Sequence, residues 1–176
     1  MSCIFILANT LVFLATILIF GEINSMSREM DMVFKDNMHL NELSDALTAV
    51  QDSMTDYLNA KTSDSLEEFY RNEQAYAGMI EELNDRIVGT AFLRMERSIR
   101  YMSQEYLEVV EQTIEAKRGR NVEKYRVRYE NASQMYGYIN TYINSLNSER
   151  FKNNSENYSR LSESFHSFEG ISMLVL

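Results

Sequence analysis

The 176-residue chain has no proline, no tryptophan, six glycines and one cysteine. Without proline, no residue removes a backbone hydrogen-bond donor, so long uninterrupted helices are allowed throughout. The single cysteine, Cys3, excludes an internal disulfide and a cysteine redox or zinc pair. Basic residues are also scarce: 17 Lys and Arg face 26 Asp and Glu, for a net charge of −9. That balance argues against nucleic acid as a partner, because a duplex binder needs cations to displace counterions.

Sequence motifs of catalysis are lacking as well. The chain has two histidines, His39 and His166, and no HExxH, GxGxxG, P-loop or GxSxG pattern. No acidic residue directly follows His166, as one would in the phosphoacceptor box of a histidine kinase. A di-iron bundle needs Glu-x-x-His from two helices, and Glu163–His166 supplies that spacing once. We therefore expect no enzyme activity in this chain, no cofactor and no metal.

Long apolar runs are present at both ends. Residues 3–20, CIFILANTLVFLATILIF, carry no charge and cover about 27 Å of a ~30 Å hydrocarbon layer as a helix. They predict a transmembrane helix; a cleaved signal peptide is the alternative, disfavoured because a basic n-region and an A-x-A site are missing. Residues 171–176, ISMLVL, cover only about 9 Å. We interpret them as the start of a second, truncated transmembrane helix, the alternative being an apolar tail that packs on a core.

Residues 22–169 show apolar side chains at alternating steps of three and four, which predicts helices almost throughout. Breaks are expected after residue 61, near Asn84–Asp85 and at Gly119. The expected fold is all-α: an elongated antiparallel four-helix bundle or coiled coil, continuous with the N-terminal transmembrane helix and the start of the second.

Local signals mark two of the helix ends. Asp64 followed three residues later by Glu67 resembles a capping box and predicts a helix start. Gly119 suits the left-handed position after a helix, and Asn121 can cap the helix that follows.

Two groups of residues are candidates for function. Arg94, Arg97 and Arg100 lie close together on the third predicted helix and could contact an anionic ligand; the alternative is surface pairing with Glu96 and Glu105. A polar interruption at 147–157 weakens the apolar seam of the fourth helix. It predicts a signal-relay segment with the residues Arg150, Asn153, Asn154 and Asn157.

The order of these parts resembles the sensor region of bacterial membrane-bound two-component sensor histidine kinases with an all-helical extracytoplasmic domain. The residues that carry the resemblance are the run 3–20, the heptad stripes and the return to apolar sequence at 170–176. The resemblance implies a signal-sensing domain that relays a rearrangement of the bundle through transmembrane helices to a kinase domain absent from this chain. Chemoreceptors share this plan, and a non-signalling tethered coiled coil is a further alternative.

The residues also lead to expected partners and a location. We expect a lipid bilayer and an unknown extracellular ligand or partner protein. A long, thin bundle with tyrosine at several core positions favours a homodimer, with pairing within one chain as the alternative. The folded segment is not enriched in Lys or Arg beside either apolar run, so the positive-inside tendency does not hold it in the cytoplasm. The expected location is the plasma membrane, with the helical domain on the extracytoplasmic side.

Overall fold

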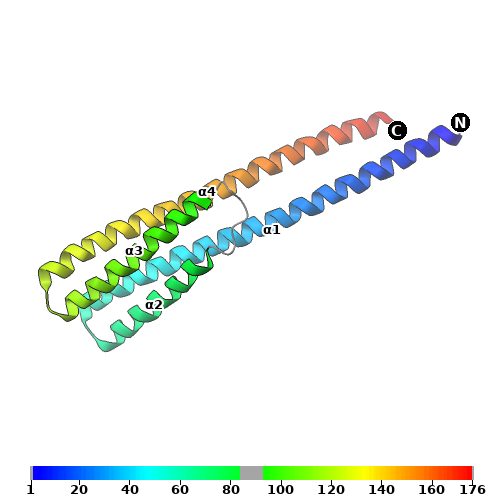
Figure 1. The fold of residues 1–176 in the computed structure, drawn as a ribbon. Coiled ribbons are helices and arrows are strands. Elements are labelled where there is room, and N and C mark those ends of the chain that lie inside the picture. Colours follow the sequence, from blue (N-terminus) through cyan, green and yellow to red (C-terminus); the bar gives the residue numbers. More distant parts are fainter. Residues whose placement is uncertain (1, 84–92, 176) are drawn as a thin grey trace. The chain divides into compact units, whose positions relative to one another are not determined.

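The computed structural model describes the backbone of residues 2–83 and 93–175. Side chains are described within these ranges except at positions 2–5, 7, 8, 11, 12, 29, 33, 36, 154, 157, 158 and 160–175. Four helices make up the described chain: α1 Ser2–Ala60, α2 Ser63–Glu82, α3 Leu93–Arg118 and α4 Val122–Val175 (Figure 1). Since these ranges contain no strand, the predicted all-α class is confirmed. The turn expected at Asn84–Asp85 lies outside the described residues.

The chain forms two compact units, and α1 and α4 each contribute to both. Unit 1 consists of residues 1–37 and 149–176, and unit 2 of residues 38–148. In unit 2 all four helices pack alongside one another, with the turns at 61–62 and 119–121 at the same end (Figure 1). Because these turns are so short, α1 and α2 run antiparallel, as do α3 and α4.

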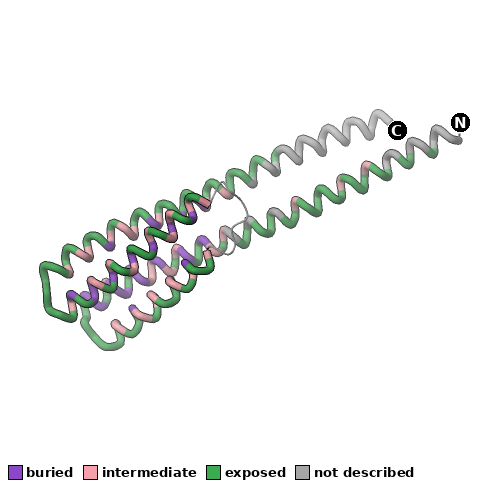
Figure 2. The backbone as a smooth tube through the Cα atoms, viewed as in Figure 1, coloured by how far each residue is buried: buried purple, intermediate pink, exposed green. Residues whose placement is uncertain are grey.

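The core of unit 2 consists of apolar residues at steps of three and four, the spacing that the sequence predicts. Figure 2 shows the buried positions on the inward side of each helix. α1 contributes a run with heptad-like spacing, and α4 contributes the stripe that faces it. On α3, Val110 is fully buried whereas the neighbouring Val109 is half-buried. The fully or nearly fully buried apolar residues are Leu40, Leu43, Leu47, Val50, Met54, Phe69, Tyr76, Ile80, Ile99, Tyr106, Val110, Ile114, Ala132, Ile139, Ile143 and Leu146.

The N-cap of α2 lies two residues before the predicted one. Thr62 is the N-cap: its Oγ1 accepts a hydrogen bond from the backbone N–H of Ser65 at 3.2 Å. The backbone N–H of Thr62 in turn donates to Ser65 Oγ at 3.3 Å, which completes a capping box. Asp64 lies instead in the first turn, where a carboxylate stabilises the helix dipole.

The end of α3 is also displaced by one residue from the prediction. The N–H of Asn121 donates to the carbonyl of Ala116 at 3.0 Å, and that of Arg120 to the carbonyl of Lys117 at 3.1 Å. This is the Schellman pattern, and its left-handed residue is Arg120 (φ 60°), not Gly119. Asn121 does cap α4, because its Oδ1 accepts from the N–H of Lys124 at 3.0 Å.

The predicted membrane location is wrong. In the described part of the chain, no helix has a stretch both long enough and apolar enough to span a bilayer. The predicted transmembrane helix at 3–20 is therefore unsupported, and the side chains at 171–176 lie outside the described residues.

Candidate functional site

A layer of polar side chains crosses the apolar core of unit 2 and includes a residue from every helix. Its members are Gln51 of α1, Tyr76 of α2, Ser103 and Tyr106 of α3, and Ser133 of α4. Tyr76, Ser103 and Tyr106 are fully buried, and Gln51 is 8% exposed. Such groups are costly to bury unless they are hydrogen-bonded, so their partners decide whether the layer is stable.

Two hydrogen-bonded branches satisfy the layer. In one, the Tyr106 hydroxyl donates to Gln51 Oε1 at 3.0 Å, and Gln51 Nε2 donates to Ser133 Oγ at 3.0 Å. In the other, the Tyr76 and Ser103 hydroxyls are 2.6 Å apart. The rings of Tyr76 and Tyr106 join the branches in an edge-to-face contact, with centroids 6.4 Å apart and planes at 87°. All four helices are thereby coupled at one level of the bundle.

The layer carries no charge near neutral pH. Burial raises the pKa of Tyr76, against a smaller lowering by its hydrogen bond to Ser103. Burial also raises the pKa of Tyr106. Neighbouring groups raise it further by smaller amounts, and Tyr76 makes the largest of these contributions. Both hydroxyls therefore stay protonated, and a group of this kind is unsuited to general acid–base catalysis near pH 7. The layer instead fixes the positions of the helices along one another, because each hydrogen bond forms only when the helices keep their axial register.

A row of hydrogen bonds between α1 and α4 sets that register. Four pairs succeed one another along the seam: Ser44 with Asn140 (2.8 Å), Thr48 with Tyr136 (3.2 Å), Gln51 with Ser133 (3.0 Å) and Thr55 with Tyr129 (3.4 Å). As the number rises by four, three and four on α1, it falls by the same steps on α4. This is the spacing of one helix face. A slide of α4 along α1 would break the four contacts together.

The predicted arginine group lies on α3. Arg94 and Arg97 are exposed and Arg100 is half-buried. Glu96, which the sequence suggested as a surface partner, is only 2% exposed. The role of the three arginines as ligand contacts stays a prediction.

The predicted relay residues lie on the part of α4 that belongs to unit 1. α4 runs through this segment without a break. Arg150 is half-buried and Asn153 is exposed, whereas the side chains of Asn154 and Asn157 lie outside the described residues. A relay role for the segment also stays a prediction.

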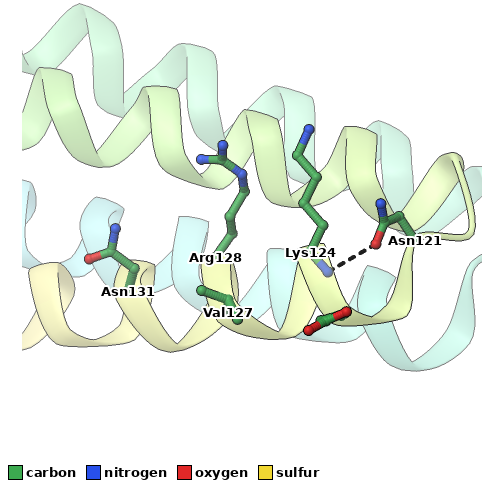
Figure 3. Close-up of a pocket in the computed structure, with 6 residues that line it drawn as sticks. Asn121, Lys124, Val127, Arg128 and Asn131 are labelled. Atoms are coloured by element: carbon green, nitrogen blue, oxygen red, sulfur yellow. Dashed lines mark hydrogen bonds between the residues drawn. The ribbon is translucent and has the colours of Figure 1, made fainter.

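Described residues line a surface hollow in each unit. The hollow in unit 2 measures about 520 Å³ and lies over the first turns of α4; Figure 3 shows the Asn121 cap with Lys124 and Arg128 extending nearby. The hollow in unit 1 measures about 530 Å³ and lies between α1 and Phe151 of α4, with Phe34 of α1 on its wall. Phe34 and Phe151 are 73% and 69% exposed. Within the described residues, no group of three or more His, Cys, Asp or Glu could hold a metal ion.

The sequence did not predict the polar layer, although part of it was visible. Tyr76 and Tyr106 fall on the apolar stripes, and a buried tyrosine hydroxyl needs a partner. Gln51 and Ser103 carry no comparable signal, since a polar residue beside an apolar stripe is normally at its solvated border. Only the packed structure shows that these residues are the partners.

Comparison with known proteins finds a similar fold but no matching family. No protein-family model matches the chain, and no curated protein does. Among solved structures, a chain of the XylFII-LytSN complex is similar, with a TM-score of 0.63 and 16% sequence identity. The match covers 68% of this chain and 98% of that chain. At this identity the likeness concerns the fold alone: nearly all of that chain's fold is contained in this one.

Proposed function

We propose that this chain is the signal-input domain of a sensor histidine kinase and that its helical bundle binds a partner protein. The observation that carries the proposal is the shared fold, which extends over almost the whole of the neighbouring chain. In that complex, LytSN is the N-terminal sensor domain of a histidine kinase and is bound to a second protein, XylFII. The resemblance that the sequence shows to sensor regions points to the same class.

In this proposal, the polar layer is the element that changes when a partner binds. A partner shifts an equilibrium between two packings only if it binds one of them more tightly. Buried polar groups specify one register of a helical bundle while they weaken its apolar seam. A small displacement of α4 against α1 would break the hydrogen bond between Gln51 and Ser133, which makes this layer the natural boundary between two discrete packings.

The predicted functional residues have definite roles in this scheme. Arg94, Arg97 and Arg100 would contact acidic groups of the partner. The segment 147–157, with Arg150, Asn153, Asn154 and Asn157, would transmit the displacement of α4. Both roles depend on the proposal.

The test uses the protein expressed from the native gene, with a single substitution in the polar layer. Gln51→Leu removes the two hydrogen bonds that the Gln51 side chain forms, with Tyr106 of α3 and Ser133 of α4, and keeps a side chain of similar size. Gln104→Leu, at an exposed position on α3, is the matched control. The measurement is phosphate incorporation by the native protein and transfer to its response regulator, with the folded state of each variant checked by circular dichroism.

We expect Gln51→Leu to shift the basal level of phosphorylation several-fold, and Gln104→Leu to leave it unchanged. A native protein that incorporates no phosphate would refute the assignment to sensor kinases. A folded Gln51→Leu variant with wild-type output would refute the role of the layer.

A further inference from the structure

One stretch of α4 has no charged residue although the chain as a whole is rich in them. Between Glu130 and Glu149, residues 131–148 include no Asp, Glu, Lys, Arg or His. The inward side of this stretch lies in the core of unit 2. The outward side is exposed along its whole length (Figure 2). We call it the α4 outer face, and it consists of Asn131, Gln134, Gly137, Tyr138, Thr141, Tyr142, Asn144, Ser145 and Ser148.

The other helices of unit 2 have the charged exteriors that are normal for solvated surfaces. Residues 38–60 of α1 carry four acidic residues and no Lys or Arg, α2 carries six acidic residues and one arginine, and α3 carries five of each sign. The α4 outer face instead exposes two tyrosines four residues apart, Tyr138 (64% exposed) and Tyr142 (42% exposed). Residues at this spacing are neighbours on one side of a helix. A surface without charged residues that exposes tyrosines is typical of the centre of a protein–protein interface.

The charge distribution of the chain indicates which partner can bind the α4 outer face. Two copies of the chain, each with a net charge of −9, would bring carboxylates together if they met through α1 or α2. Contact through the α4 outer face places no charged side chain from residues 131–148 in the interface. Its amides and hydroxyls both donate and accept hydrogen bonds, so the face can pair with an identical face related by a two-fold axis.

We propose that the α4 outer face pairs with the same face of a second copy of this chain. Gly137, where an added Cβ would meet nothing within 4 Å, leaves room beside Tyr138 for a tyrosine ring of the other copy. The proposal does not depend on the function proposed above, because a chain of any function can self-associate through this surface.

The size of the face limits the affinity. Eighteen residues of helix extend about 27 Å. One helix pair of that length covers less than the ~1,200 Å² of a standard stable interface. We therefore expect a reversible dimer whose population rises with concentration, not a permanent one.

The test is the mass of the full chain in sedimentation equilibrium over a hundredfold range of concentration. We expect the wild-type mass to rise from that of the 20.6 kDa monomer towards twice that value. The double variant Tyr138→Glu with Tyr142→Glu adds two like charges to each copy and should remain monomeric. Tyr101→Glu is the matched control, because Tyr101 is 62% exposed but lies on α3, and it should associate as the wild type does.

The effect of added salt on association distinguishes pairing through an uncharged face from pairing driven by opposite charges. Salt screens the repulsion between two acidic copies, so pairing through an uncharged face should be unchanged or strengthened at 0.5 M NaCl. Association that weakens in salt would overturn the proposal, as would a wild-type chain that stays monomeric. The proposal also fails if the double variant, shown by circular dichroism to be folded, associates like the wild type.

Discussion

Tyr106→Phe and Tyr76→Phe remove a hydroxyl from the same polar layer, yet we expect them to differ in cost. Tyr106 donates to Gln51 Oε1, and Gln51 is nearly buried. Its removal leaves a buried acceptor without its partner, which costs about 1–3 kcal/mol.

Tyr76 bonds instead to Ser103. A helical serine can turn its hydroxyl to the carbonyl four residues earlier, as buried Ser53 does to Ala49 at 2.7 Å. Because Ser103 has this alternative, we expect Tyr76→Phe to cost only about 0.5–1.5 kcal/mol. The expected order of cost is therefore Tyr106→Phe above Tyr76→Phe.

The assay is urea unfolding of the full chain, followed by far-ultraviolet circular dichroism and by the near-ultraviolet signal of the tyrosines. Coincident transitions from the two probes would justify a two-state free energy for each variant. The pair Gln51→Leu and Tyr106→Phe should be non-additive by about 0.5–2 kcal/mol, because either substitution breaks the bond that they share. A Tyr76→Phe variant that costs as much as Tyr106→Phe, or a coupling close to zero, would refute this account of the layer.

Two further predictions concern α2 and the turn after α3. Burial, and to a smaller extent the Glu111 carboxylate, raise the pKa of Glu73 above its ordinary value. The folded chain then binds this proton more tightly than the unfolded chain, so the contribution of Glu73 to stability falls as pH rises through the raised pKa. Because Glu73 is only half-buried, solvent screens much of this effect, so Glu73→Gln should stabilise the fold at pH 7 by no more than about 0.5 kcal/mol. The gain should vanish near pH 4. An equal gain at both pH values in urea unfolding would contradict the reasoning. Arg120 is left-handed, a conformation that costs a residue with a Cβ about 1 kcal/mol, so Arg120→Gly should raise the urea midpoint by the equivalent of about 0.5–1 kcal/mol. Arg120→Ala, which retains a Cβ, is the control and should give no such gain.

The sequence determined the helices because their signals are local. Apolar steps of three and four, the absence of proline and the cap at Asn121 are each contained within a few turns of chain. The buried apolar positions of α1 and α4 follow the same steps of three and four. The sequence patterns were less accurate at the turns, where Thr62 and Arg120 took positions expected for Asp64 and Gly119. Neighbouring residues compete for a cap with little difference in energy, and the geometry of the closed turn decides between them.

The apolar run at 3–20 was open to more than one interpretation. Its composition alone favoured a membrane helix, yet no described helix of the folded chain is long and apolar enough to span a bilayer.

Only the tertiary structure decided which polar groups meet. An apolar stripe says which side of a helix faces inward, but a slide by one heptad leaves the stripe equally buried. The pairs Ser44–Asn140 and Gln51–Ser133 distinguish these registers, because a hydrogen bond tolerates only a few tenths of an ångström whereas apolar contact tolerates far more. Residues more than eighty positions apart carry no local sign of their pairing. The polar layer and the register it fixes therefore exist only in the packed bundle, while the helices that carry it were already present in the sequence.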